Sequence, residues 1–338
     1  MSTVAEPVPA APGGAPPVPA LSVRDLVVRY GRAGKTPPAV DGVSFDVAPG
    51  ETLGLVGESG SGKSTIGKAI LGLQPASAGQ VRLHGTDITR ASLRRRRVAA
   101  VDLRVVFQDP YSSLNPGQSI GQTLAEPLRV LRVPRDQRHT RVAESLTAVG
   151  LPADTAARYP AQFSGGQRQR IAIARALVCE PKVIVLDEPV SALDLSTQAQ
   201  VLNLLADLRD QRQLALLFIA HDLGVVRFLA QRVVVLYRGQ VMETGGADEV
   251  TAHPRHPYSI ALTAAAPVPQ PAEQARRRAA REALGIGTAG AAPPAAGGCP
   301  FAARCPLATD VCRTERPPLA GGVACHHAGQ AAGLRLPA

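Results

Sequence analysis

The residues that could do chemistry begin with a glycine-rich stretch, GESGSGKST, at positions 57–65. Its spacing is that of a phosphate-binding loop, or P-loop, which is a glycine, four residues and then Gly62-Lys63-Ser64. An apolar run at 52–56 precedes the loop and a helical pattern starts near Lys63, so we expect a strand, a turn and a helix. Glycines let the backbone turn tightly, and the free N–H groups at the helix start can then face an anion.

Within this loop, two side chains are predicted to contact different parts of a bound nucleotide. The Lys63 ammonium should reach the β- and γ-phosphates, and the Ser64 hydroxyl should ligate Mg²⁺. Glycine-rich turns also precede helices in proteins that bind no nucleotide, so the interpretation depends on motifs further along the chain. The residues expected to contact the nucleotide are Gly57, Glu58, Ser59, Gly60, Ser61, Gly62, Lys63, Ser64 and Thr65.

Two adjacent carboxylates, Asp187 and Glu188, follow the aliphatic run 183–186. Four aliphatic residues in a row indicate a strand buried on both faces, and parallel sheets bind ligands at the carboxyl ends of their strands. Asp187 is suited to hold Mg²⁺, directly or through water, and Glu188 is suited to polarise the water that attacks the γ-phosphate. A solvated strand end is the alternative interpretation, which the P-loop upstream disfavours.

Three further polar side chains each end an apolar run. His221 is predicted to contact the γ-phosphate, although an isolated histidine is more often a core or loop residue. Gln108 is predicted to complete the Mg²⁺ shell or to orient water, because its side chain is polar and uncharged. Tyr30 offers a flat face on which adenine can stack, and an ordinary strand aromatic is the alternative. Glu188, His221 and Gln108 are therefore the catalytic candidates.

A second anion site is predicted at FSGGQ, residues 163–167, which precedes a helical pattern over 168–177. A helix that starts after Gly-Gly presents free N–H groups to an anion. Apolar residues recur at helical spacing from about 110 to 177, which predicts a helical subdomain. The strand-ended motifs lie in 21–108 and 177–250, which predicts an α/β core.

Together and in this order, the motifs resemble those of the ATPase subunit of an ABC transporter over residues 21–250. The resemblance implies an α/β P-loop NTPase with a RecA-like core, an antiparallel β subdomain and a helical signature subdomain, which hydrolyses ATP with Mg²⁺. It identifies the P-loop, a Q-loop at Gln108, the signature at 163–167, a Walker B motif at 183–188, a D-loop at 191–194 and the switch histidine His221.

Longer stretches resemble those of one group within this family, the ATP-binding subunits of bacterial dipeptide/oligopeptide (and nickel) importers. These are FQDPYSSLNP at 107–116, DEPVSALDLSTQAQVLNLL at 187–205 and HPRHPYSIAL at 253–262. The chain looks more like the second of the two ATPase subunits that such importers carry. The resemblance implies a second ATPase subunit, two transmembrane permease subunits and an extracytoplasmic substrate-binding protein as partners. It places the chain at the cytoplasmic face of the cell membrane, as a peripheral protein.

Two alternatives to peptide import remain. Nickel or another small solute could be the cargo, because the pockets that bind the solute lie in other chains. An ABC-type ATPase that works in DNA repair or translation without a membrane partner is less favoured. Such relatives usually join two cassettes in one chain, whereas this chain carries one cassette and the HPRHPY stretch.

The signature is expected to lie away from the P-loop of its own chain. Two chains arranged head to tail could hold each ATP between the P-loop of one chain and the signature of the other. The residues predicted to contact ATP in trans are Ser164, Gly165, Gly166 and Gln167. A heterodimer is favoured over a homodimer, because importers of the resembled family carry two different ATPase subunits.

Residues 251–338 are predicted to form a C-terminal extension, with a linker rich in Ala, Pro, Gly and Arg at 263–298. Four of the five cysteines follow in a small Cys-rich segment, namely Cys299, Cys305, Cys312 and Cys325. A reducing compartment argues against disulfides, and the spacing suits an iron–sulfur cluster at least as well as zinc, with unligated thiols as a third reading. The family resemblance implies a 4Fe–4S cluster. His326 and His327 are spare ligands.

Composition limits the remaining function classes. The net charge is +10, but only 3% of residues are aromatic and tryptophan is absent, so a nucleic-acid partner is not expected. The basic run 94–97 reads either as a solvated helix face or as a contact for anionic lipids or an acidic partner. No apolar run reaches the ~20 residues of a membrane span. Residues 1–20, rich in Ala, Pro and Gly, lack signal-peptide features and are expected to be a disordered leader.

Overall fold

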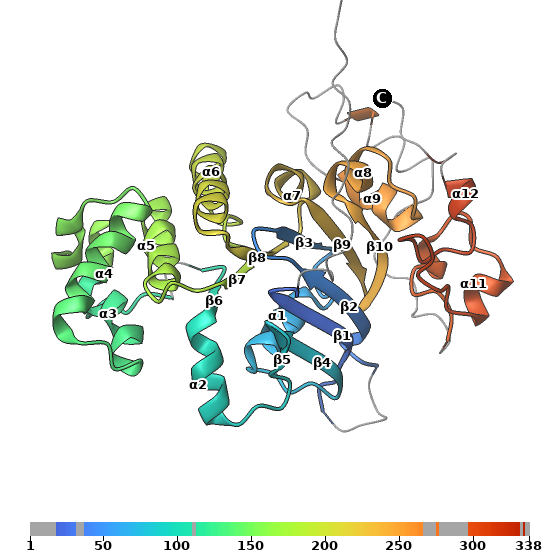
Figure 1. Cartoon of the computed structure of the whole chain (residues 1–338). Coiled ribbons are helices and arrows are strands. Elements are labelled where there is room, and N and C mark those ends of the chain that lie inside the picture. Colours follow the sequence, from blue (N-terminus) through green and yellow to red (C-terminus); the bar gives the residue numbers. More distant parts are fainter. Residues whose placement is uncertain are drawn as a thin grey trace, which may run out of the picture.

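The structure is a computed structural model, and it describes residues 18–31, 37–109, 113–265, 275–276, 297–331 and 334 (Figure 1). Most of the leader predicted at 1–20 and most of the linker predicted at 263–298 therefore lie outside the described residues. Within the described part of the chain, no helix has both the length and the apolar content that crossing a membrane requires.

A six-stranded sheet forms the centre of the molecule, with strand order β10-β9-β3-β8-β7-β6. Strands β9, β3, β8, β7 and β6 pair in parallel, and β10 pairs antiparallel with β9 at the edge. The bounds are β3 (Thr52–Val56), β6 (Leu103–Val106), β7 (Val183–Asp187), β8 (Ala215–Ala220), β9 (Arg232–Tyr237) and β10 (Gln240–Gly246). Every residue of β3 and β8 is buried, which accounts for their uninterrupted apolar sequences.

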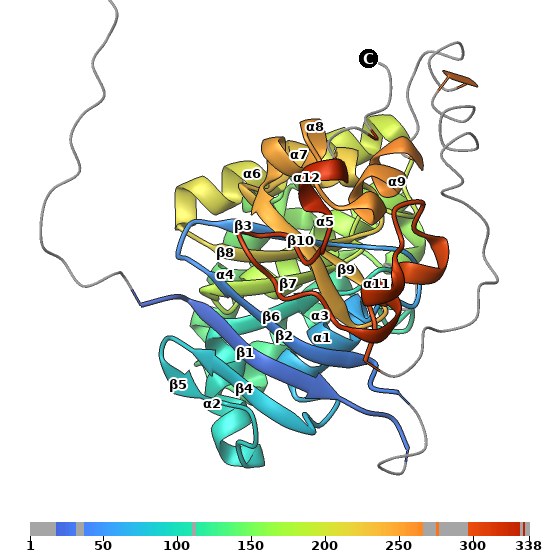
Figure 2. The same ribbon diagram turned by 90° about the vertical axis from the view of Figure 1, so that its right-hand side faces the viewer.

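A second, antiparallel sheet has the order β2-β1-β4-β5. Its strands are β1 (Leu21–Val28), β2 (Val40–Val47), β4 (Ala78–Leu83) and β5 (Thr86–Asp87). Helix α1 (Lys63–Leu71) packs between the two sheets, since Ile66 and Ile70 share one hydrophobic cluster with residues of both (Figure 2). The P-loop helix is therefore fixed on two sides by apolar packing.

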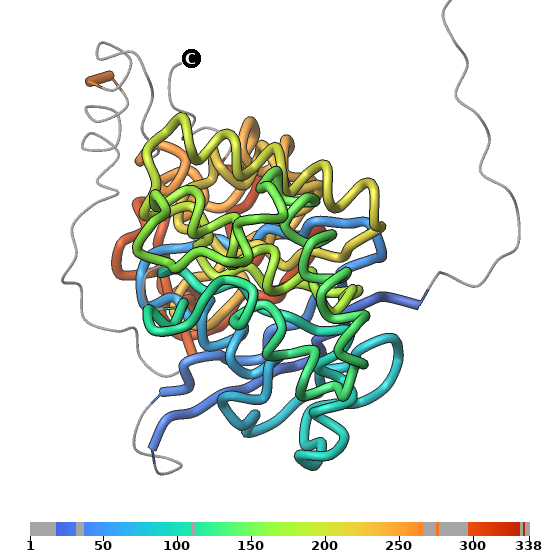
Figure 3. The backbone as a smooth tube through the Cα atoms, turned by 90° about the vertical axis from the view of Figure 1, so that its left-hand side faces the viewer, coloured from blue at the N-terminus to red at the C-terminus, as the bar shows by residue number. Residues whose placement is uncertain are grey.

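Helices fill the segment between β6 and β7, and the described residues of 113–177 contain no strand. They are α3 (Ile120–Val130), α4 (Arg135–Ala148), the short helices η1 (Ala153–Ala157) and η2 (Pro160–Gln162), and α5 (Gly165–Leu177). These helices form a separate lobe at one side of the sheet (Figure 1), and this lobe faces the viewer in Figure 3. Helix α5 starts three residues before the predicted position, because Ser164 and Gln167 form a capping box at its N-terminus.

The basic run 94–97 lies on α2 (Leu93–Asp102), a helix with no buried residue. Three of the four arginines are exposed, whereas Arg96 folds back and donates to the carbonyl oxygens of Ile70 at 2.8 Å and Thr89 at 3.1 Å. The run is therefore not one continuous solvated face, because Arg96 packs against the protein, and the three exposed arginines fit both interpretations of the run.

The remaining helices follow the core strands along the chain. They are α6 (Leu195–Arg212), α7 (Leu223–Leu229), α8 (Ala247–Ala252), α9 (Pro257–Ala265), η3 (Ala302–Arg304), α11 (Asp310–Thr314) and α12 (Ala328–Ala331). The cysteine-containing segment, residues 297–331, lies beside β10 (Figure 2). The Thr244 N–H donates to the Gly322 carbonyl at 2.8 Å, and the Ala324 N–H donates to the Met242 carbonyl at 2.9 Å. This segment is therefore attached to the edge of the core sheet.

Candidate nucleotide site

The P-loop connects the end of β3 to the start of α1. Gly62 is the N-cap of α1 and has a φ of 104°. A Cβ atom at this position would lie 2.5 Å from the Ala39 carbonyl oxygen, so a side chain there would displace the backbone. The loop is thus closely packed against Ala39, the residue that precedes β2.

The Lys63 side chain is buried within this loop. Its ammonium donates to the carbonyl oxygens of Gly57 at 2.6 Å and Glu58 at 2.9 Å. Burial lowers the pKa of Lys63, while the negative charges of Glu188, Asp187 and Glu58 act against that shift. An anion inside the loop would give this ammonium a charged acceptor, which forms a stronger hydrogen bond than a neutral carbonyl does.

The two residues predicted to hold Mg²⁺ from the P-loop and from β7 are in contact. The Ser64 hydroxyl donates to Asp187 Oδ1 at 3.0 Å. Burial raises the pKa of Asp187, and within the described residues this carboxylate forms no ion pair. A partly buried carboxylate without an ion-pair partner, beside a hydroxyl, suits a divalent cation, because Mg²⁺ is usually held by one or two carboxylates, waters and substrate phosphates.

The three catalytic candidates converge on one carboxylate oxygen. Glu188 Oε2 accepts from Gln108 Nε2 at 3.2 Å and lies 3.4 Å from His221 Nδ1. Gln108, which the sequence also assigned to Mg²⁺, thus contacts Glu188 rather than the Ser64–Asp187 pair. These side chains follow β6, β7 and β8, which are neighbours in the sheet.

The Glu188 backbone is in the left-handed region, with φ 49°, and its N–H donates to the Ile219 carbonyl at 3.0 Å. Such a conformation costs on the order of 1 kcal/mol for a non-glycine residue and is common at functional sites. Glu188 and His221 line a cavity of about 160 Å³. This space has room for a few water molecules at ~30 Å³ each, which suits a carboxylate that activates water.

Tyr30 lies beside the P-loop helix. Its hydroxyl is 3.3 Å from the Thr65 hydroxyl, and about half of the residue is exposed. The ring is therefore placed where a nucleobase could reach it from solvent.

The signature residues lie on a different element from the P-loop. The Ser164 hydroxyl accepts from the Gln167 N–H at 3.3 Å, which forms the cap of α5. A Cβ at Gly166 would lie 2.2 Å from Thr197 Cγ2, so glycine lets α5 approach the start of α6. Helix α5 packs against α3, α4, α6 and β6, whereas α1 packs against β1, β6 and β7. The signature thus belongs to the helical lobe and the P-loop to the core.

A contact that the sequence did not indicate joins the C-terminal segment to the P-loop. Arg304 donates through Nη1 to Glu58 Oε2 at 2.9 Å and through Nη2 to Glu58 Oε1 at 3.0 Å. The Glu58 N–H donates to the Tyr258 hydroxyl at 2.8 Å. Arg304 and Glu58 are 246 positions apart, so no spacing rule could have paired them.

The second half of the stretch HPRHPY, residues 256–258, is buried against the same segment. Tyr258 packs against Tyr237 with ring centroids 4.6 Å apart and against Phe301 at 5.4 Å. Burial lowers the pKa of His256 to about 4, and its Nδ1 accepts from the Tyr258 N–H at 2.9 Å. His256 is therefore a neutral structural residue at neutral pH, and the aromatic cluster connects α9 to the cysteine-containing segment.

The four clustered cysteines are partly or fully buried and form no disulfide. Burial raises the pKa of Cys305 to about 12, and Cys325, Cys299 and Cys312 are close enough to add to that shift. Even so, no group of three or more His, Cys, Asp or Glu side chains in the described part of the chain is arranged to hold a metal ion. The predicted spare ligands are engaged elsewhere: His327 Nε2 lies 2.9 Å from the Thr309 hydroxyl, and His326 Nε2 lies 3.1 Å from the Glu315 carbonyl.

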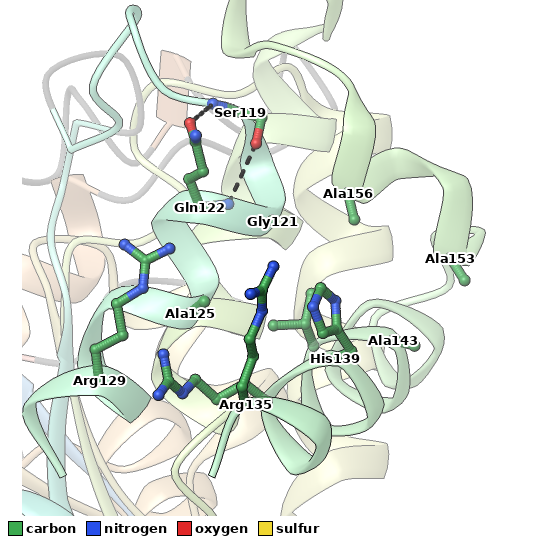
Figure 4. Close-up of a pocket in the computed structure, with 12 residues that line it drawn as sticks. Ser119, Gly121, Gln122, Ala125, Arg129, Arg135, His139, Ala143, Ala153 and Ala156 are labelled. Carbon is green, nitrogen blue, oxygen red and sulfur yellow. Dashed lines mark hydrogen bonds between the residues drawn. The ribbon is translucent and has the colours of Figure 1, made fainter. Parts of the chain in front are cut away.

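A further cavity, of about 630 Å³, lies in the helical lobe (Figure 4). Its basic lining residues are Arg129, Arg135, Arg138 and His139, from α3 and α4. None of the phosphate motifs lines it, so it is separate from the candidate nucleotide site.

Two family models match the chain. The model for ABC transporters matches residues 40–191, and the model for the oligopeptide/dipeptide transporter C-terminal region matches residues 242–312. A Brucella ovis protein with the provisional name of peptide import ATP-binding protein is 47% identical over 302 residues, or 89% of this chain and 94% of the relative. The chain belongs to the ATP-binding subunits of ABC transporters.

Further relatives agree with this family. A Brucella abortus protein with the same provisional name is 48% identical over 297 residues, covering 85% of this chain and 86% of the relative. The solved structure of cbiO1 from Clostridium perfringens, part of an ABC transporter complex, has a TM-score of 0.64 and 28% identity and covers 69% of this chain and 91% of its own. An ABC cassette solved as a dimer in a post-hydrolysis state with ADP and Pi has a TM-score of 0.60 and 28% identity, and covers 67% and 98%. The chain is thus an ABC-type ATPase, and the predicted fold class is confirmed.

The first prediction concerns Glu188 of this ATPase. Glu188→Gln should retain ATP binding but lower turnover roughly 10²–10⁴-fold, because the amide cannot polarise the attacking water. Single-turnover hydrolysis in the assembled transporter measures this step. The exposed carboxylate Glu144 on α4 provides the control Glu144→Gln, which should hydrolyse ATP at the wild-type rate. Wild-type hydrolysis by Glu188→Gln would contradict the assignment.

The second prediction separates binding from hydrolysis. Lys63→Ala removes the buried ammonium and should weaken equilibrium binding of ATP itself, unlike Glu188→Gln. Nucleotide titration measures the difference, with Lys68→Ala on the exposed face of the same helix as control. Equal ATP affinity in Lys63→Ala and wild type would show that this loop does not hold the phosphates.

Proposed function

We propose that this ABC ATPase energises the uptake of dipeptides and oligopeptides across the cytoplasmic membrane. The observation that carries the proposal is the oligopeptide/dipeptide transporter C-terminal region at 242–312, joined to a single ATPase cassette. The provisional names of the Brucella relatives support it. Import of nickel or another small solute is the second candidate, because this chain is predicted to hold no solute-binding pocket.

The proposed reaction takes place at the carboxyl ends of the core strands. The P-loop binds the phosphates of ATP, and Lys63 stabilises the charge on the β- and γ-phosphates. Ser64 and Asp187 would hold Mg²⁺, which neutralises phosphate charge during the reaction. Glu188 accepts a proton from the attacking water, while Gln108 and His221 orient that carboxylate through the contacts at 3.2 Å and 3.4 Å.

ATP is proposed to lie between two ATPase subunits. The signature belongs to the helical lobe, so the N-terminus of α5 would meet the γ-phosphate from the other subunit, through Ser164, Gly165, Gly166 and Gln167. A similar cassette solved as a dimer with ADP and Pi supports this arrangement. We propose a heterodimer with a second ATPase subunit, from the resemblance to importers with two such subunits.

The permease partners are proposed to contact a groove at the junction of core and helical lobe. This groove, of about 520 Å³, lies between α2, β6 and α3. Leu73 and Val130 line it and are 63% and 68% exposed, and four arginines and Glu126 also contribute to the lining. A groove that combines exposed apolar and basic side chains suits a segment of a protein partner. Phe107, also in the lining, precedes Gln108, so a docked permease segment would lie close to the hydrolytic residues. We propose two permease subunits and an extracytoplasmic binding protein as partners, with this chain on the cytoplasmic face.

The C-terminal cysteines are proposed to ligate a 4Fe–4S cluster, with zinc as the alternative. The donor set would be Cys299, Cys305, Cys312 and Cys325. It is supported by the resemblance to importer subunits and by the His327 N–H, which donates to Cys325 Sγ at 3.4 Å. Hydrogen bonds to sulfur are a feature of cluster sites. Ligation requires deprotonated thiols, so the positive charge of the bound metal would have to outweigh the burial that raises the pKa of Cys299, Cys305 and Cys325.

The third prediction tests the cargo. The cognate binding protein, purified from cells, should retain dipeptides or oligopeptides, and a peptide-loaded binding protein should stimulate ATP hydrolysis by the reconstituted transporter. Mass spectrometry identifies the retained solute, and the complex with Glu188→Gln is the control for stimulation. Nickel or another solute in place of peptide, with stimulation by that solute alone, would contradict peptide import.

The fourth prediction tests the cluster. Protein purified without oxygen should be brown, absorb broadly near ~400 nm and contain about four irons per chain. Changing any of the four cysteines to Ser should lower the iron content, whereas Cys179→Ser, at an isolated core cysteine, should not. A colourless protein with about one zinc per chain would show that zinc is bound instead of the cluster. Anaerobic protein without iron or sulfide would rule the cluster out.

A further inference from the structure

Glu58 is the only acidic residue in the P-loop stretch GESGSGKST. A free carboxylate in a loop that receives the phosphates of ATP would repel them, because like charges raise each other's energy at close range. The carboxylate is 42% exposed, and both of its oxygens accept hydrogen bonds from Arg304, at 2.9 Å and 3.0 Å. Arg304 and Glu58 therefore form a bidentate ion pair, which offsets the negative charge of Glu58.

Arg304 is held in position by the C-terminal segment. Its side chain is only 16% exposed, and its guanidinium lies 5.4 Å from the ring centre of Phe301. Nη1 also lies 3.3 Å from the Tyr237 hydroxyl. Because Phe301 and Tyr237 pack against the buried Tyr258, whose hydroxyl accepts from the Glu58 N–H, the side chain and the backbone of Glu58 are both tied to one aromatic cluster.

We propose that Arg304 is a positioning residue for ATP binding, which neutralises Glu58 and holds the P-loop in a shape that accepts phosphate. This inference rests on the proposed assignment of the P-loop as the nucleotide site. It makes the C-terminal segment a determinant of ATP affinity, although none of the phosphate motifs lies in that segment.

The same geometry connects the cysteines to the P-loop. Arg304 directly precedes Cys305, and the Cys299 N–H donates to the Cys312 carbonyl at 2.8 Å across the segment. A change that displaces the backbone around these thiols would also move the guanidinium away from Glu58.

The test is equilibrium titration of MgATP with the full chain. Arg304→Gln should weaken ATP binding about threefold to tenfold, because a partly exposed ion pair is lost and a carboxylate is left unpaired near the phosphates. The double variant Arg304→Gln with Glu58→Gln should bind ATP within about twofold of wild type, because the repelling carboxylate is gone. If Arg304 only supported the fold, removal of Glu58 would not restore binding.

A matched control removes another ion pair between the same segment and the core. Arg316 donates to Asp41 Oδ2 at 3.0 Å and to the Asp41 carbonyl at 2.9 Å. Arg316→Gln should leave ATP affinity unchanged, since this contact involves no P-loop residue. Equal weakening in Arg316→Gln and Arg304→Gln would overturn the proposal in favour of a general loss of docking.

Two further variants test the proposal if Arg304→Gln does not fold or binds ATP as wild type does. If Arg304→Gln does not fold, Arg304→Lys tests the idea: it keeps a positive charge beside Glu58 and should bind ATP within about threefold of wild type, and a larger loss would contradict charge neutralisation. Lys63→Ala separates the proposed role of Arg304 from the assignment of the P-loop as the nucleotide site. Weakened binding in Lys63→Ala with wild-type binding in Arg304→Gln would overturn only this inference, whereas wild-type binding in both would reject the P-loop assignment itself.

Discussion

Burial of the Lys63 ammonium within the loop between β3 and α1 fixes the charged groups around it. The ammonium donates to two carbonyl oxygens of the loop, at 2.6 Å and 2.9 Å, and lies in the field of Asp187, Glu188 and Glu58. A buried cation needs nearby negative charge or an anion, because desolvation is otherwise too costly. The carboxylates at the end of β7 therefore stabilise the buried ammonium, and the phosphates of ATP would take over part of that role.

The order of the strands in the core sheet brings the candidate catalytic residues close to the P-loop. Strands β3, β8, β7 and β6 are successive neighbours and run parallel, so the residues that follow them gather at one edge. Glu188 therefore lies within hydrogen-bond range of Gln108, and 3.4 Å from His221. The helical lobe carries the signature on α5, apart from this edge, which is why a complete site is proposed to need a second subunit.

The parts of this account that depend on local sequence could be predicted. The strand 52–56 and the helix start at Lys63 follow from apolar runs and glycine spacing, and the structure has both at those positions. Boundaries failed where side chains decide them, as at α5, whose capping box moved its start to Gly165. Contacts between residues far apart in the chain produce no periodic pattern in the sequence. The Arg304–Glu58 pair and the Glu188–Gln108 contact could therefore be identified only from the structure. The spacing of the cysteines likewise indicated a cluster site, but spacing alone does not fix how the thiols are oriented.

The most direct test is a structure of the Glu188→Gln variant, assembled with its partner ATPase and soaked in MgATP. The account predicts phosphates inside the 57–65 loop, Mg²⁺ beside Ser64 and Asp187, the signature of the other subunit on the γ-phosphate, and the Arg304–Glu58 pair intact beside the nucleotide. Phosphates bound elsewhere, or covered by Ser164 of the same chain, would contradict it.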